Sequence, residues 1–136
     1  MEMPKASDFT QRMGIETLEA AEGVCVMALD VDERHMSMAS RAHGGVLFTM
    51  LDTALGRAVI TNLPEGRGCA TIEAKINYFR PVQSGRITAT GRAVRMTRRT
   101  AYAEGVIVDE EGNELARASG TFMLTDTMKQ AERERV

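Results

Sequence analysis

The residue whose type and position point most clearly to chemistry is Asp52, a carboxylate within an apolar segment. Residues 45–61, GVLFTMLDTALGRAVIT, are otherwise mostly apolar and carry the spacing of a helix. On such a helix the neighbours of Asp52 on its own side are apolar or glycine: Phe48, Leu55, Gly56 and Val59. A carboxylate there costs free energy unless it is hydrogen-bonded, and proteins accept that cost mainly at functional sites. We therefore favour a functional role for Asp52 over that of a buried structural carboxylate.

Gly56 lies one helical turn after Asp52. A glycine inside a helix is about 1 kcal/mol less favourable than alanine, so its presence needs a reason. Two explanations carry equal weight: something approaches closely beside Asp52, or the helix packs tightly against a neighbouring element.

His43, Gly44 and Gly45 stand where the apolar helix should begin. Two glycines leave backbone N–H groups accessible at the positive end of the helix dipole, where they can polarise a carbonyl or hold an oxyanion. A tight loop-to-helix turn is the plainer explanation of the same residues. His35 and His43 form no metal-ligand spacing with a cysteine or a carboxylate pair, so no metal site is expected.

The spacing of Gly44 and Asp52 limits how they can cooperate. Eight residues of one helix separate them by about 12 Å, too far for both to contact one scissile carbonyl. If both act on one substrate, they must come from the helices of two subunits. The sequence therefore indicates a dimer with composite sites.

The elements around these residues can be read from periodicity and turn signals. Before the helix we expect a short helix over 6–13, with Ser7 as its cap and Gly14 as its stop, one strand over 17–30 and a loop over 32–41. Asn62 and Pro64 should end the long helix, and the polar tail from Asp126 should be a frayed helix.

After Gly68 the apolar period changes to two, which is typical of strands. The alternation ends at Arg80-Pro81, and three more strands are expected over 85–96, 100–109 and 114–124. Short turns between consecutive strands predict an antiparallel meander, and hence an α+β fold. A helix that is apolar nearly all round should be wrapped by this sheet or by a partner chain.

Composition sets the remaining limits. A chain of 136 residues fits one domain, 1–136, and its net charge of −2 with dispersed basic residues gives no footprint for nucleic acid. Cys25 and Cys69 form no CxxC pair, and free thiols are the expected state, although one disulfide stays open. No apolar run reaches the ~20 residues of a membrane span, and no signal peptide is recognised, so a cytoplasmic location is expected.

Three segments together resemble a known family: HGGVLFTMLDTALGRA, INYFRPV and RRTAYAEGVIVDEEGNELARASGTF. They are similar to the hotdog-fold acyl-CoA thioesterases, and most of all to the phenylacetate-degradation (PaaI-like) group with its 4-hydroxybenzoyl-CoA thioesterase relatives. The resemblance covers about 16–124. It implies an antiparallel sheet wrapped around one long central helix. It also implies a homodimer, or a tetramer built as a dimer of dimers.

The resemblance also implies roles for individual residues. Asp52 matches the catalytic carboxylate, as nucleophile or as general base for water. Gly44, in the motif with His43, matches the amide of the opposite subunit that polarises the thioester carbonyl. Thr71 matches a hydroxyl that orients the water in some relatives. Ser37 stands where relatives often carry Asn, and its shorter reach puts substrate choice in doubt.

For the CoA part of the substrate, the matching basic residues are Arg80, Arg98 and Arg99, since arginine offers phosphate a planar fork of donors. No separate cofactor is implied. Candidates to line an acyl pocket are Met36, Met38, Phe48 and Met50.

The sequence thus favours hydrolysis of an aryl- or short- to medium-chain acyl-CoA to the free acid and CoA. Two other classes remain open on the same fold. One is an acyl-CoA binding or sensor module without catalysis. The other is an enoyl-CoA hydratase, which would use an acid/base pair such as Asp52 with His43.

Overall fold

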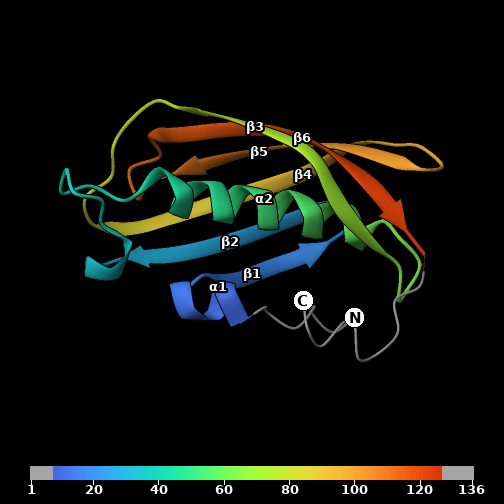
Figure 1. Ribbon diagram of the computed structural model, residues 1–136, viewed down its shortest axis with the longest axis horizontal. Helices are drawn as coiled ribbons and strands as arrows, with labels where there is room; N and C mark the ends of the chain where they lie inside the picture. The colour runs from blue at the N-terminus through green and yellow to red at the C-terminus, as the bar shows by residue number, and fades with distance from the viewer. Residues whose placement is uncertain (1–7, 127–136) are drawn as a thin grey trace.

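The computed structural model describes residues 8–126. A six-stranded antiparallel sheet curves around one long helix, α2 (Gly44–Thr61), which crosses its concave face (Figure 1). The strands are β1 Glu16–Ala21, β2 Val24–Val31, β3 Gly68–Tyr78, β4 Gly85–Met96, β5 Thr100–Val108 and β6 Glu114–Thr125. A short helix, α1 (Asp8–Met13), precedes β1, and one 3₁₀ turn, η1 (Glu33–His35), follows β2. The predicted α+β hotdog architecture is confirmed.

Helix α2 supplies the centre of the hydrophobic core. Its apolar side is fully buried against the sheet, where it meets the inward-facing residues of β2, β4, β5 and β6. Close approach is possible because small residues face the helix. At Gly91 of β4 an added Cβ would lie 2.7 Å from the backbone of Ala54. The helix is therefore held rigidly along this side.

The prediction of one strand over 17–30 was wrong, because the structure divides this segment into β1 and β2. Glu22 and Gly23 make a tight turn between them, both with positive φ (50° and 79°). This is the geometry of a two-residue hairpin turn, in which the first position usually carries Asn, Asp or Gly. A glutamate there, followed by an alternation of apolar residues, concealed the turn.

The predicted meander of four strands was also wrong in part. β4, β5 and β6 are consecutive neighbours, but β3 pairs with β6 rather than β4, and the sheet order is β1-β2-β4-β5-β6-β3. The chain leaves β3 at Tyr78 and enters the middle of the sheet between β2 and β5. β3 is therefore an edge strand, with one hydrogen-bonding edge unpaired within residues 8–126.

Most other local predictions are confirmed. The short helix runs over Asp8–Met13 and stops at Gly14 (φ 77°), the left-handed conformation that glycine favours at a helix end. The segment 32–41 is a loop that includes η1. Ser7 and the tail beyond Asp126 lie outside the described residues. None of the helices within 8–126 is long and apolar enough to span a membrane.

Candidate active site

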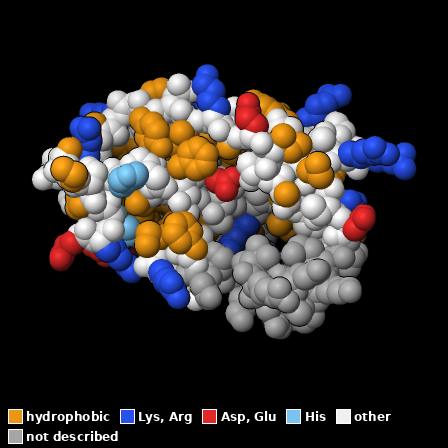
Figure 2. Space-filling view, in the orientation of Figure 1, with side chains coloured by type: hydrophobic (Ala, Val, Ile, Leu, Met, Phe, Trp, Pro, Cys, Tyr) orange, Lys and Arg blue, Asp and Glu red, His pale blue; other side chains and the backbone are white. Residues whose placement is uncertain are grey.

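Asp52 lies on the side of α2 that faces β3, where it is hydrogen-bonded. The Thr71 hydroxyl of β3 donates to Asp52 Oδ1 at 2.8 Å, so two residues predicted to share the site meet in the structure. Asp52 is half-buried rather than buried, because the sheet leaves this side of the helix uncovered in the single chain. Hydrophobic side chains gather around an acidic group in the middle of this face (Figure 2). The carboxylate is thus oriented by one donor and open to an approaching molecule.

The start of α2 presents a backbone donor. The His43 side chain caps the helix, since its Nδ1 accepts from the Gly45 N–H at 2.8 Å. Among residues 8–126 the Gly44 N–H has no acceptor. Of the two glycine amides that the sequence offered, Gly44 therefore keeps its N–H available, and His43 acts in the structure as a cap.

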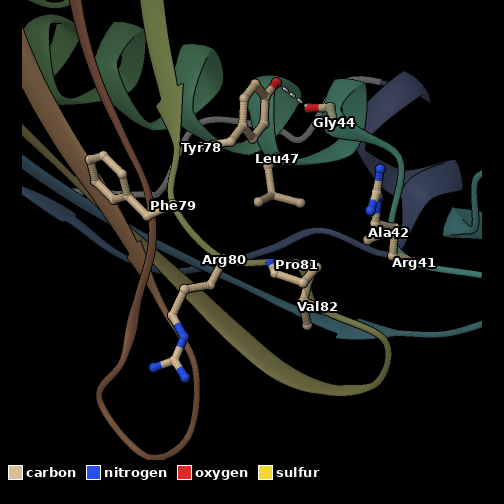
Figure 3. Close-up of a pocket in the computed structure, with 9 residues that line it drawn as sticks. All are labelled: Arg41, Ala42, Gly44, Leu47, Tyr78, Phe79, Arg80, Pro81 and Val82. Atoms are coloured by element: carbon tan, nitrogen blue, oxygen red, sulfur yellow. Dashed lines mark hydrogen bonds between the residues drawn. The ribbon is translucent and has the colours of Figure 1, made fainter. Parts of the chain in front are cut away.

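Tyr78, at the end of β3, fixes the position of Gly44. Its hydroxyl donates to the Gly44 carbonyl at 2.6 Å, and its side chain points to the helix start (Figure 3). A Cβ on Gly44 would lie 3.1 Å from the Tyr78 hydroxyl, a tight contact that would require the Tyr78 side chain to shift by a few tenths of an ångström. Burial raises the pKa of Tyr78, so the hydroxyl stays a donor at neutral pH. No pattern in the sequence predicts this role, apart from the position of Tyr78 at the end of the alternation of its strand.

β3 and α2 run antiparallel, side by side. Tyr78 meets Gly44, Thr71 meets Asp52, and the Cys69 thiol donates weakly to the Gly56 carbonyl at 3.5 Å. Each step forward along β3 is therefore a step backward along α2. One chain thus carries two candidate half-sites, an amide half at Gly44 and a carboxylate half at Asp52, about 12 Å apart along the helix.

A pocket of about 370 Å³ opens beside the amide half. The residues lining it come from the loop before α2, the start of α2, the end of β3 and the segment after β3, and all of them are labelled in Figure 3. They include Gly44 and Arg80, which the sequence analysis names as candidates, and also Arg41, which it does not. The pocket thus places cationic groups near a free backbone donor.

A second pocket, of about 640 Å³, lies at the other end of β3. Arg98 and Arg99 line it together with Arg67, whose Nε donates to the Thr125 carbonyl at 3.1 Å. β3 has 11 residues and so spans roughly 35 Å. Arg80 and the Arg98-Arg99 pair are therefore separated within one chain, although the sequence assigned them to one ligand.

Other predicted residues fall elsewhere. The Ser37 hydroxyl accepts from the Ala39 N–H of its own loop at 3.3 Å. Met38 is fully exposed at the tip of this loop, whereas Met50 is fully buried in the core, so neither shares the half-buried position of Phe48 on α2. Within residues 8–126 no group of three His, Cys, Asp or Glu could hold a metal ion.

Both cysteines are free thiols, as expected. Burial, with a smaller contribution from the nearby Asp52 charge, raises the pKa of Cys69 to about 11. Burial also raises the pKa of Cys25 to about 11, against the opposing effect of Arg57. Cys69 is therefore a neutral thiol beside the carboxylate half-site at physiological pH.

Comparisons with known proteins identify the family of this chain. Residues 40–116 match the family described as the thioesterase superfamily. A Deinococcus radiodurans protein named "Putative esterase" is 34% identical over 120 residues, which cover 87% of this chain and 80% of that protein. The chain belongs to the thioesterase superfamily.

Two further similarities bear on the group within the family. The 1,4-dihydroxy-2-naphthoyl-CoA hydrolase of Listeria monocytogenes is 26% identical over 100 residues, covering 74% of this chain and 81% of that enzyme. The solved phenylacetic acid degradation protein PaaI of Thermus thermophilus, a point mutant, is 32% identical with a TM-score of 0.78. It covers 85% of this chain and 96% of its own. The PaaI-like resemblance is confirmed.

Proposed function

We propose that this protein hydrolyses acyl-CoA thioesters as a homodimer, with Asp52 of one subunit and Gly44 of the other at each site. The observation that carries this proposal is the pair of half-sites along the antiparallel α2 and β3. Each half has one of the two groups that thioester hydrolysis needs, and neither can reach the other within one chain.

A two-fold axis near the middle of β3 would complete both sites. It would pair the free edge of β3 with the same edge of the partner subunit. The Tyr78–Gly44 contact of one subunit would then lie beside the Thr71–Asp52 contact of the other. β3 is a long edge strand with exposed apolar side chains, Ile72 and Tyr78 among them at 54% and 50%. Such an edge invites pairing with another strand. Gly44 of the partner subunit would then face Asp52.

In the proposed reaction the Gly44 N–H of the partner subunit polarises the thioester carbonyl and stabilises the negative charge that develops on its oxygen. Asp52 attacks the carbonyl carbon directly, forming a mixed anhydride that water then hydrolyses, or it removes a proton from a water that attacks the carbon. The carbon–sulfur bond breaks, CoA leaves as a thiolate, and the acyl group ends as the free acid. Thr71 orients the Asp52 carboxylate through its hydrogen bond, and His43 holds the Gly45 N–H so that the Gly44 N–H stays directed outward.

The same axis accounts for the separated arginines. It would bring Arg98 and Arg99 of one subunit toward Arg80 of the partner subunit, because they lie at opposite ends of β3. Together these guanidinium groups would bind the phosphates of CoA. The CoA-ester substrate in the name of the Listeria relative supports this substrate class.

The test is thiol release from a panel of aryl-, short-chain and medium-chain acyl-CoAs. The Asp52→Asn variant should lose roughly 10³-fold in kcat or more, the scale typical of removing an essential catalytic group. Light scattering should give a dimer or a multiple of it. Mixing Asp52→Asn with a Gly44→Pro variant, which lacks the amide donor, should restore part of the activity, because mixed dimers contain one intact site.

Other outcomes would select the alternatives. Binding of acyl-CoA without release of CoA above the Asp52→Asn level would favour a sensor module. Loss of the enoyl absorbance of crotonyl-CoA without thiol release would favour a hydratase.

A further inference from the structure

His35 is a buried histidine, 1% exposed, and both of its ring nitrogens are hydrogen-bonded. Its Nδ1 accepts from the Asp32 N–H at 2.9 Å, so the ring proton is on Nε2, which donates to the Met13 carbonyl at 2.7 Å. Asp32 is the N-cap of η1, and Met13 is the last residue of α1. The imidazole is therefore held in one orientation by two different elements.

The backbone carbonyl of His35 is bound in turn by the start of helix α2. The His43 N–H donates to it at 2.7 Å, and just inside this bond Met36 and Ala42 pair as an isolated β-bridge. The loop 36–42 is thus closed at its base. The position of His43 therefore depends on the position of His35.

His43 directly precedes the amide that the proposed reaction uses. Its own N–H is held by the His35 carbonyl, and its side chain holds the Gly45 N–H. The Gly44 N–H lies between these two bonded amides and has no acceptor of its own among residues 8–126. Its direction is therefore set by the two amides beside it. At a catalytic group a misplacement of about 1 Å can cost roughly 100-fold in rate.

Arg34, the residue before His35, makes a comparable contact at the surface. Its Nη1 donates to the Arg12 carbonyl at 2.7 Å, one residue before the carbonyl that His35 binds. The Arg34 side chain is 50% exposed, and among residues 8–126 no hydrogen bond connects it with the segment 36–45. Both residues tie the loop to α1, but only His35 is bonded onward to the start of α2.

We propose that His35 positions the Gly44 N–H, because its buried side chain fixes the carbonyl that holds His43. His35 acts through the backbone and does not touch the substrate, so it is a positioning residue. The inference rests on the proposed function, since it assigns His35 to the amide half-site. Loss of His35 should therefore impair the amide half of its own subunit and leave the Asp52 half intact.

The experiment compares His35→Asn, His35→Gln and Arg34→Gln with wild type on acetyl-, hexanoyl- and benzoyl-CoA. Asparagine is too short to reach the Met13 carbonyl, whereas the amide of glutamine can replace Nε2 as the donor. His35→Asn should lower kcat roughly 10- to 100-fold with little change in KM. His35→Gln should lose less, and Arg34→Gln should stay close to wild type.

Mixed dimers, made by coexpression, identify the half-site that is affected. In mixed dimers of His35→Asn with Asp52→Asn, one site combines an intact Asp52 with an intact amide half, so activity should rise above that of either variant alone. In mixed dimers of His35→Asn with Gly44→Pro, neither site has both halves intact, so activity should not exceed that of His35→Asn. If His35→Asn does not fold, the same mixtures are made with His35→Gln.

Three results would overturn the inference. One is wild-type kcat in His35→Asn. Another is an equal loss in Arg34→Gln, which would reduce the role of His35 to a contact between α1 and the loop. The third is recovery with Gly44→Pro or with neither partner, which would place the defect outside the amide half. A wild type that releases no CoA, or an inactive mixture of Asp52→Asn with Gly44→Pro, would instead refute the proposed function, so the two failures are distinguishable.

Discussion

The two long sides of helix α2 differ in how completely the sheet buries them. The side that faces β4 and β5 is closed: Ala54 and Leu55 are fully buried, and Gly91 lies against the helix backbone. The side beside β3 is open: Asp52 and Gly56 are half-buried, and hydrogen bonds with Thr71 and Cys69 cross to the strand. The first side holds the fold together, and the second is available for chemistry.

This difference shows that packing requires a glycine on one side of the helix and not on the other. On the closed side glycine lets two backbones approach each other, so its loss should cost stability. On the open side a Cβ at Gly56 would meet its neighbours at ordinary van der Waals distances of 3.5 Å and 3.9 Å, so its addition should cost no stability. Substitutions that separate stability from activity can therefore test the comparison.

The largest stability effect should come from the closed side. Gly91→Ala places a Cβ against the Ala54 backbone and should lower the free energy of unfolding by about 3 kcal/mol. Urea denaturation of both proteins measures the change. Gly56→Ala is the matched control and should be no less stable than wild type. Equal stability of Gly91→Ala and wild type would contradict the close packing of this side.

On the open side, Thr71→Val removes the hydroxyl that donates to Asp52 while keeping the shape of the side chain. We expect kcat to fall roughly 10- to 100-fold, or about 1.4–2.7 kcal/mol of activation free energy, with little change in KM. Thr71→Ser keeps the hydroxyl and should stay close to wild type. A similar loss in both variants would show that the methyl group matters and not the hydrogen bond.

Tyr78→Phe removes the hydrogen bond to the Gly44 carbonyl at the start of the open side. The free energy of unfolding should fall by about 1 kcal/mol, the usual net contribution of one hydrogen bond. Tyr102→Phe removes a Tyr102–Glu104 hydrogen bond on the exposed face of β5 and serves as control. If the control loses as much stability as Tyr78→Phe, the bond to Gly44 has no special role in fixing the helix start.

The smallest effect concerns alkaline pH on the closed side. Burial raises the pKa of Cys25 to about 11 from the ordinary value of 9.0, so the folded state keeps its proton where the unfolded state loses it. This contribution to stability is present below pH 9 and is lost as the pH rises through 11. At pH 9.5 the loss should be about 0.8 kcal/mol.

Cys25→Ala should show a correspondingly flatter decline of the free energy of unfolding between pH 8 and 9.5. Parallel declines in the variant and wild type would assign the alkaline response to other groups.

Local patterns in the sequence predicted the parts of the site that depend on one element. Helical periodicity predicted α2 to within one residue at its start. It also placed Asp52 on the helix as a carboxylate among apolar and glycine neighbours. The spacing of Gly44 and Asp52 predicted a separation of about 12 Å along one helix, and both residues do lie on α2. This distance follows from the sequence because the rise and turn of a helix are fixed by its backbone.

Only the tertiary structure decided how the strands pair. Strand pairing determines both the turn at Glu22 and Gly23 and the position of β3 at the sheet edge. The alternation of apolar residues along one strand does not specify which strand pairs with it. The roles of Tyr78 and Cys69 follow from that placement, because each acts on a helix residue distant in sequence.

The sequence by itself therefore determined that α2 carries a carboxylate on one side and an amide donor at its start. The tertiary structure decided that β3 lies antiparallel beside this helix and leaves an edge free. It also decided that packing within the chain does not require a glycine at position 56, because the neighbours of a glycine come from elements far from it along the chain.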